Sequence, residues 1–196
     1  RGARLRAEIL ERHAVALGVS STREEIAHAV LDRIEEAFEL TVTAVNLVEG
    51  GHIAVFAGRD ANQEQVAAHQ GVAVSADLPG PFAIATNEPL LLNSSTDIEQ
   101  RFPHLADVAA GYGIDTLLAL PIRGLRRNAL GALVVGRGGE HAFTLSDLAL
   151  LHDLAEKTGV SLDRAELFDS LVTAHEQQRT VAIRLQESLL PDAVVA

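Results

Sequence analysis

The residues of this sequence that could take part in catalysis or bind metals and phosphates are its eight histidines, its glycine clusters and its carboxylates. No two histidines stand three or four residues apart, the spacing that places two zinc ligands on one helix face. The only lysine, Lys157, follows Glu156 inside an expected helix, so the chain has no glycine-lysine phosphate loop. It also lacks a Gly-x-Ser-x-Gly elbow and a convincing catalytic carboxylate pair. We therefore expect a domain that is not itself an enzyme and that holds no metal ion.

One glycine cluster, Gly136 to Gly139, follows an expected strand, as phosphate-binding loops do. Its spacing departs from Gly-x-Gly-x-x-Gly and it leads to Phe143 rather than directly into a helix, so we interpret it as a turn. The chain contains no cysteine. This absence excludes disulfides, thiolate metal sites, cysteine nucleophiles and a thioether-linked chromophore.

Charge and hydropathy narrow the range of partners. The formal net charge of −11 repels phosphate backbones and anionic lipids, so we expect neither nucleic acid nor a membrane as a partner. The longest apolar runs, such as 116–122, are far shorter than the roughly 20 residues that span a bilayer. Cysteine-free composition fits a reducing compartment, and we expect a cytoplasmic location. The chain begins at Arg1 and contains no methionine, so we expect a fragment of a longer protein.

Hydrophobic periodicity predicts the elements that would position any site. Residues 4–17 read as a helix that ends at Gly18, and Ser21 followed by Glu24 has capping-box spacing for a second helix. The apolar stripe of this second helix consists of Ile26, Val30, Ile34 and Ala37 or Phe38. The period then changes to two, and Gly50-Gly51 predicts a hairpin between strands at 41–49 and 52–57.

The second half of the chain begins with an irregular middle segment, 74–100, which prolines punctuate. We expect helices or strands at 60–70 (helix), 82–86 (helix), 89–92 (strand), 102–111 (helix), 114–122 (strand) and 129–136 (strand). Pro121 within a strand implies a sheet edge or a bulge. Thr144 caps a last helix that no proline interrupts before Pro191. This order predicts an α+β domain with an antiparallel sheet between helices.

Several short segments, taken in order, resemble bacterial GAF domains. They are 76–81 with 87–90, then 101–105, 118–122, 130–133 and 143–147. Each is weak alone, but the ordered set over residues 20–165 is specific. The resemblance implies a GAF-like central antiparallel sheet of five or six strands flanked by helices, with a long C-terminal helix. It also implies three parts: an N-terminal helix or linker at 1–19, a GAF-like sensory domain at 20–165 and an output helix at 166–196.

The tail carries a second resemblance. Residues 176–191 look like the connector that joins such domains to SpoIIE-like serine phosphatases of the PPM class. This resemblance implies a downstream metal-dependent serine/threonine phosphatase whose metal-binding aspartates would lie beyond Ala196. We therefore expect a non-catalytic sensory domain that controls this effector.

We expect no cofactor. The Asn-Lys-x-x-Phe-x-x-x-Asp-Glu motif of cyclic-nucleotide-binding relatives has no counterpart, and bilin attachment would need a cysteine. Haem would need an axial ligand from His52, His69 or His104, and no partner residue supports one. An unidentified small apolar or amphipathic ligand could instead lie between the sheet and the middle segment. The expected lining is Val45, Asn46, Leu47, Phe56, Phe82, Phe102, Tyr112, Thr116, Leu118 and Leu120. The alternative is that these side chains simply fill a core.

The output helix shows alternating three- and four-residue apolar steps, the pattern of a coiled-coil seam. The seam positions are Phe168, Leu171, His175, Gln178, Ala182, Leu185 and Leu189. We expect a parallel homodimer through this seam, weakened at its centre by His175 and Gln178. A helix pair that passes on a signal must be weak enough to change its state. Three alternatives stay open. One is chance spacing in a solvated helix, and another is a structural dimerisation module without ligand. The third is a histidine-kinase input with His175 as phospho-acceptor, although Val181 replaces the usual proline.

Overall fold

The computed structural model describes residues 2–59, 63–139 and 143–189. The chain divides into two compact units, residues 1–163 and 164–196, whereas the sequence predicts boundaries after residues 19 and 165. In chain order the elements are α1 (Gly2–Val19), α2 (Arg23–Ala37), β1 (Val42–Glu49), β2 (His52–Gly58), α3 (Gln63–His69), α4 (Pro79–Thr86), β3 (Leu90–Leu92), α5 (Ser95–Arg101), the 3-10 turn η1 (Pro103–Leu105), α6 (Ala106–Gly111), β4 (Thr116–Arg123), β5 (Ala129–Arg137) and α7 (Leu145–Leu189).

The five strands form one antiparallel sheet in the order β2-β1-β5-β4-β3. This confirms the predicted fold class, and the described residues form five strands of the five or six expected. Pro121 lies in β4, where it pairs with Ala132 of β5. On the other side of β4, the short β3 pairs only with residues 117–119. Among the described strands, Pro121 therefore pairs with β5 alone, which explains how a residue without an N–H is accommodated.

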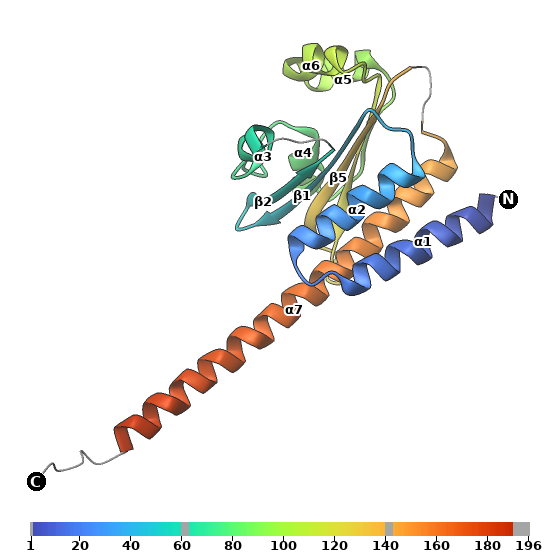
Figure 1. Cartoon of the computed structure of the whole chain (residues 1–196). Helices are drawn as coiled ribbons and strands as arrows, with labels where there is room; N and C mark the ends of the chain where they lie inside the picture. The colour runs from blue at the N-terminus through green and yellow to red at the C-terminus, as the bar shows by residue number, and fades with distance from the viewer. Residues whose placement is uncertain (1, 60–62, 140–142, 190–196) are drawn as a thin grey trace, which may run out of the picture. The chain divides into compact units, whose positions relative to one another are not determined.

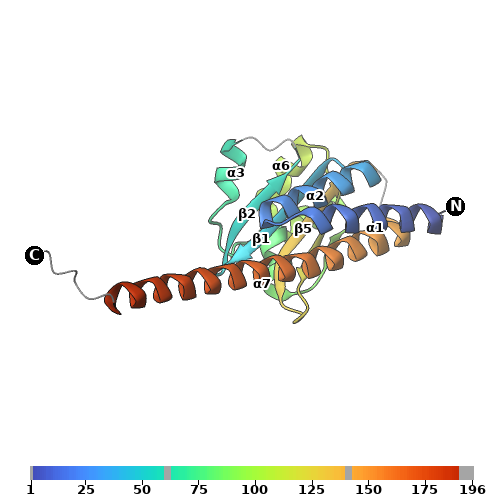
Figure 2. The ribbon, with the colours of Figure 1, turned by 60° about the horizontal axis from the view of Figure 1, so that its bottom comes forward.

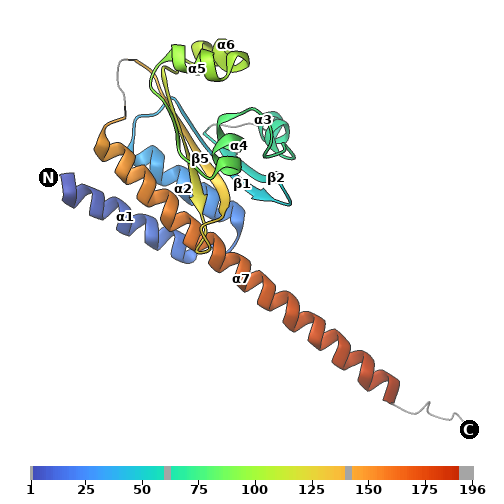
Figure 3. The ribbon, with the colours of Figure 1, turned by 180° about the vertical axis from the view of Figure 1, so that it is seen from behind.

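Helices cover both faces of the sheet. Helices α1 and α2 and the beginning of α7 lie on one face, and α3 and α4 lie on the other, as the opposite views in Figure 1 and Figure 3 both show. Helix α2 packs against β1 and β2, whereas α4 packs against β3, β4 and β5. Figure 2 shows α1 running alongside the first part of α7. We call the side covered by α2 the helical-layer face and the opposite side the α4 face.

The end of α1 and the start of α2 each differ by one residue from the predicted position. The capping box of α2 uses Thr22 and Glu25 rather than Ser21 and Glu24, because Thr22 is the residue with extended backbone before the helix. The Glu25 carboxylate accepts hydrogen bonds from the backbone N–H groups of Ser21 and Thr22, which lower the pKa of Glu25. Gly18 does not end α1, which continues to Val19.

The predicted core stripe of α2 is confirmed, since Ile26, Val30 and Ile34 are fully buried. Helix α5 is not among the predicted elements, and it begins within the segment 74–100 that the prolines mark as irregular. Its signal was present in the sequence, because the Ser94 hydroxyl accepts a hydrogen bond from the Asp97 N–H as an N-cap. Thr144 and Asp147 exchange the equivalent bonds at the start of α7, as predicted.

A histidine is buried where α1 meets α7. His13 is fully buried, and its Nε2 lies 3.3 Å from the Leu154 carbonyl oxygen and 3.3 Å from Thr158 Oγ1. Its Nδ1 has no hydrogen-bond partner among the described residues. Burial lowers the pKa of His13 to about 4, and the nearby charges of Arg33 and Lys157 act in the same direction, against the Leu154 hydrogen bond. The imidazole is therefore neutral in the folded domain at pH 7.

Acidification is expected to weaken the domain through His13. The folded-state pKa lies below the unfolded value of 6.5, so the unfolded chain binds the extra proton. The His13 contribution to stability is complete above pH 6.5 and is lost as the pH falls toward 4. Linkage gives a loss of about 2.5 kcal/mol between pH 7.5 and 4.5. Urea unfolding at several pH values measures it, and His13→Gln should flatten the curve whereas His28→Gln, on the exposed side of α2, should not.

Candidate ligand face and output helix

Cross-strand register shows which predicted pocket residues face α4. Asn46 pairs with Phe56 on β2 and with Ala132 on β5, and directly paired residues point to the same face. A Cβ at Gly80 of α4 would lie 2.2 Å from Asn46 Nδ2. Asn46 and Phe56 therefore belong to the α4 face. Asn46 lies directly beneath the start of α4, whereas Phe56 stacks on His69 of α3.

The neighbouring strand residues point the other way. Because side chains alternate along a strand, Val45 and Leu47 lie on the face opposite Asn46, where β1 packs against α2. On β4, Ala119 packs beneath Ala83 of α4, so the alternate positions face the helical layer. These are Thr116, Leu118 and Leu120, all buried. This register is incompatible with a single pocket lined by all ten predicted residues. Five of the ten instead fill the core on the helical-layer face.

Two aromatic residues of the predicted lining, Phe82 and Phe102, contact a cation from the same chain. Phe82 and Phe102 lie in the cluster formed by α4, α5, β3 and β4. The guanidinium of Arg101 lies 4.7 Å from the centre of the Phe82 ring and 4.4 Å from that of Phe102. Its Nη1 is 2.9 Å from Asp77 Oδ1. Arg101 thus occupies the space between the two aromatic faces, while Tyr112 is 62% exposed at the end of α6.

Removing Arg101 is expected to cost measurable stability. Arg101→Ala loses two cation–π contacts and an ion pair, which together contribute roughly 1–2 kcal/mol at a partly exposed site. Arg101→Lys should recover only part of this loss, because an ammonium keeps the charge without the flat stacking surface. Urea unfolding measures both variants, with Arg126→Ala in the exposed turn as the control. An equal loss of stability in Arg101→Ala and Arg101→Lys would also agree with stacking of the guanidinium on the rings. No loss of stability in Arg101→Ala contradicts it.

Asn46 is the predicted pocket residue with an unused polar atom. Its side chain is 5% exposed, and Oδ1 has no hydrogen-bond partner among the described residues. Thr116, on the other face, uses its hydroxyl to donate to the Arg137 carbonyl oxygen at 3.4 Å. A groove between α1 and α2 is lined by Glu8, Val15 and Arg33, and it includes no predicted pocket residue. A ligand that reached Asn46 would have to move α4, because α4 already packs tightly against it.

The histidines considered for haem each contact their own chain. The Nδ1 of His52 lies 3.2 Å from the Gly50 carbonyl oxygen, and the ring of His69 stacks on Phe56 with centroids 4.1 Å apart. His104 meets the Phe102 ring edge-on. Within the described ranges, no three His, Asp or Glu side chains come together as a metal site. Among the described helices, none has the length and apolarity needed to cross a bilayer.

The predicted seam residues lie on the second half of α7. In the second unit, every side chain from 166 to 184 is exposed. Phe168 is 60% exposed and Leu171 is 62% exposed, and His175, Gln178 and Ala182 are exposed with them. The side chains of Leu185 and Leu189 lie outside those that the structure describes. Leu167, Val181 and Ile183, which lie outside the predicted seam, are exposed as well. Pairing of two copies through the seam stays a prediction.

Comparison with known proteins places the fold. The sequence profile of the GAF domain family matches residues 22–162. No curated protein matches the chain. One similar solved structure is the GAF domain of the Acinetobacter phosphoenolpyruvate-protein phosphotransferase, with 17% identity and a TM-score of 0.67 over 85% of this chain and 98% of that one. Its counterpart from Coxiella burnetii has 19% identity and a TM-score of 0.68 over 84% and 96%.

A third similar structure belongs to a two-component sensor histidine kinase protein of Sinorhizobium meliloti 1021. It shares 22% identity at a TM-score of 0.55, over 75% of this chain and 94% of that domain. At these identities the likeness shows the α+β fold with its five-stranded sheet. The similar domains come from different kinds of protein, two phosphotransferases and a sensor histidine kinase protein, so the fold does not indicate which kind of protein contains this one.

Proposed function

The chain belongs to the GAF domain family, and from this premise we propose that it is the non-catalytic input domain of a longer signalling protein. In this proposal the first unit is the sensor and α7 transmits its state to a linked effector. The family match over residues 22–162 supports the sensory role.

The observation that carries the proposal is the continuity of α7. Its first part belongs to the core of the sensor, where Leu151, Leu154 and Leu162 are buried. The same uninterrupted helix continues to Leu189 with exposed Phe168 and Leu171. Because backbone hydrogen bonds make a helix stiff along its length, a displacement of the buried part is passed to the exposed part.

Pairing of two such helices gives the exposed part a partner. Two copies joined along Phe168, Leu171, Gln178 and Ala182 would form a parallel homodimer with a weak centre. Sedimentation equilibrium of the chain over a wide concentration range tests this proposal. A dimer is expected, and a chain that stays monomeric at the highest concentration removes the dimeric relay.

For the effector, the resemblance of the tail supports a metal-dependent serine/threonine phosphatase. The carrying segment is 176–191, of which residues 190 and 191 lie outside the described residues. The test is to read the coding sequence that follows Ala196 and to assay the extended protein for Mn²⁺-dependent dephosphorylation of phosphoserine peptides. A different downstream catalytic domain, or none, contradicts this effector while leaving the input role intact.

A histidine-kinase input is the second candidate, favoured by the similar domain from a sensor histidine kinase protein. In this case His175, which is exposed on α7, would accept the phosphoryl group. Radioactive phosphate on the wild-type chain but not on His175→Gln, after incubation with a kinase domain, would support it. Absence of label from both removes this candidate.

The ligand is proposed to be a small apolar or amphipathic molecule that binds on the α4 face and uses Asn46 Oδ1 as an acceptor. Its entry would move α4, which provides the differential binding that any switch needs. A thermal-shift screen against metabolites tests the site, with Asn46→Ala as the comparison. Hits that Asn46→Ala abolishes are expected. No hit from any class favours a purely structural dimerisation module.

A further inference from the structure

The sheet separates α4 from α7, yet one side chain at the end of α4 is bound to the hairpin that contacts α7. Asn87 is the C-cap of α4 and adopts the left-handed conformation with φ 54°. Arg123, at the end of β4, donates from Nε to Asn87 Oδ1 at 2.9 Å and from Nη2 to the Asn87 carbonyl oxygen at 2.6 Å. Asn87 Nδ2 donates to the Arg127 carbonyl oxygen at 2.8 Å. Three hydrogen bonds therefore join the end of α4 to the β4–β5 hairpin.

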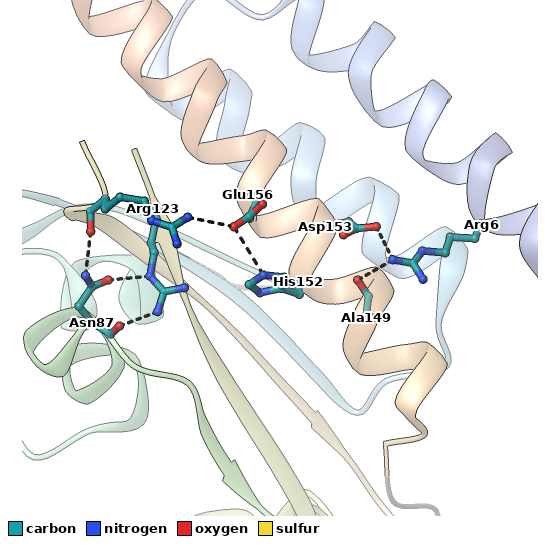
Figure 4. Close-up of polar contacts among 8 residues, drawn as sticks. Arg6, Asn87, Arg123, Ala149, His152, Asp153 and Glu156 are labelled. Atoms are coloured by element: carbon teal, nitrogen blue, oxygen red, sulfur yellow. Dashed lines mark hydrogen bonds and ion pairs between the residues drawn. The ribbon is translucent and has the colours of Figure 1, made fainter. Parts of the chain in front are cut away.

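The same hairpin is held by α7. The Leu125 N–H donates to Asp163 Oδ2, and Arg127 Nη1 lies 3.7 Å from Glu156 Oε1. His152 Nε2 lies 3.5 Å from the same Glu156 oxygen. Figure 4 shows the guanidinium of Arg123 bonded to Asn87, and Glu156 bonded to His152 on α7. Residues 152, 156, 159 and 163 recur at three- and four-residue steps, so they form one stripe along α7.

The contact at the centre of this stripe is between backbones. A Cβ at Gly159 would lie 1.8 Å from the Arg123 carbonyl oxygen, so α7 approaches β4 more closely than any other residue would permit. Arg123 thus touches both layers: its guanidinium holds Asn87, and its carbonyl group packs against Gly159. We call the set Asn87, Arg123, Leu125, Arg127, Glu156, Gly159 and Asp163 the hairpin clasp.

We infer that the hairpin clasp is the coupling element by which a displacement of α4 reaches α7. The inference rests on the proposed input function, because it gives the route between the ligand face and the output helix. The clasp suits this task physically, since Asn87 and Asp163 are bonded to the same short turn and neither can move without changing its geometry. A second tie, from Arg137 Nη1 to Asp147 at 3.3 Å, joins α7 to the far end of β5 but does not involve α4.

Hydrogen exchange on the full chain tests the route from α4 to α7. Asn87→Gly removes both side-chain bonds while glycine keeps the left-handed backbone without strain. We expect amide exchange in residues 154–163 of α7 to rise roughly tenfold, with exchange in α2 unchanged. Asn87→Asp, which keeps the acceptor for Arg123 and loses the donor to Arg127, should give a smaller rise. Glu88→Gly, next to Asn87 but exposed, is the control.

Reciprocity provides the second arm, because coupling acts equally in both directions. Asp163→Ala is expected to raise exchange in α4 and at residues 87–90, whereas Asp169→Ala on the exposed part of α7 should not. The inference is overturned if each substitution affects only its own helix, or if exchange rises equally in α2, which marks a general loss of stability. Both exchange experiments can be done on a monomer. A chain that stays monomeric in sedimentation would contradict the proposed dimer without contradicting the coupling between α4 and α7.

Discussion

Gly159→Ala is expected to destabilise the domain by about 3 kcal/mol, one of the two largest effects predicted for this chain. The added Cβ would lie 1.8 Å from the Arg123 carbonyl oxygen and 2.6 Å from its carbonyl carbon. Both are backbone atoms in a paired strand, so no side-chain rotation can relieve the overlap. The first part of α7 must move away from β4, which opens the core around Leu151, Leu154 and Leu162. Urea unfolding followed by circular dichroism measures the loss.

Gly18→Ala is the matched control for this substitution. Gly18 is also helical, in α1, and a Cβ there would meet nothing within 4 Å. Replacing it should therefore stabilise the domain by about 0.5–1 kcal/mol, the ordinary helix-propensity difference. The sign of the two effects is the test. If Gly159→Ala also stabilises, α7 and β4 do not approach each other as closely as described, and the hairpin clasp loses its central contact.

Leu171→Asp is expected to raise the dissociation constant of the proposed homodimer by about a thousandfold. Each buried leucine contributes about 2 kcal/mol, and a parallel dimer loses two of them at one level, about 4 kcal/mol in total. Two facing carboxylates add repulsion to this loss. Leu171 is 62% exposed in the single chain, so its replacement should leave the fold of the sensor intact. Sedimentation equilibrium measures the dissociation constant and urea unfolding of the first unit checks the fold.

Val172→Asp is the control for the dimer prediction. Val172 is the next residue on the same helix, is also exposed at 41%, and lies outside the predicted seam. The same charge is added and a similar apolar group is lost, so only the position differs. A strong effect at Leu171 with a weak one at Val172 supports the predicted seam. Equal weakening by both substitutions means that the helices pair along another face.

The order and type of most elements could be predicted from the sequence. These elements depend on interactions between residues close in the chain. They include the apolar stripe of α2, the hairpin at Gly50-Gly51, the strands β4 and β5, and the Thr144 cap. Periodicity, turn residues and capping side chains record such interactions directly. The capping box of α2 was misplaced by one residue because Ser21 and Thr22 are both good caps, and only the backbone conformation distinguishes them.

The candidate site could not be assembled in the same way. Both faces of β1 are covered, so Val45, Asn46 and Leu47 are all buried and alternation of polarity gives no signal of which face each one occupies. The packing of Gly80 on Asn46 shows which of these side chains lie on the α4 face. Gly80 and Asn46 are 34 positions apart in the sequence, 80 against 46. Local pattern cannot predict such a contact.

The sequence by itself therefore determined the family, the alternation of helices and strands and the long apolar-patterned last helix, because these follow from short-range preferences of the chain. Only the tertiary structure decided which side of the sheet each strand residue faces, that Arg101 lies between Phe82 and Phe102, and that Asn87 and Gly159 meet through Arg123. These are contacts between distant segments. They depend on strand register and on close approach of backbones, and neither leaves a periodic trace in the order of the residues.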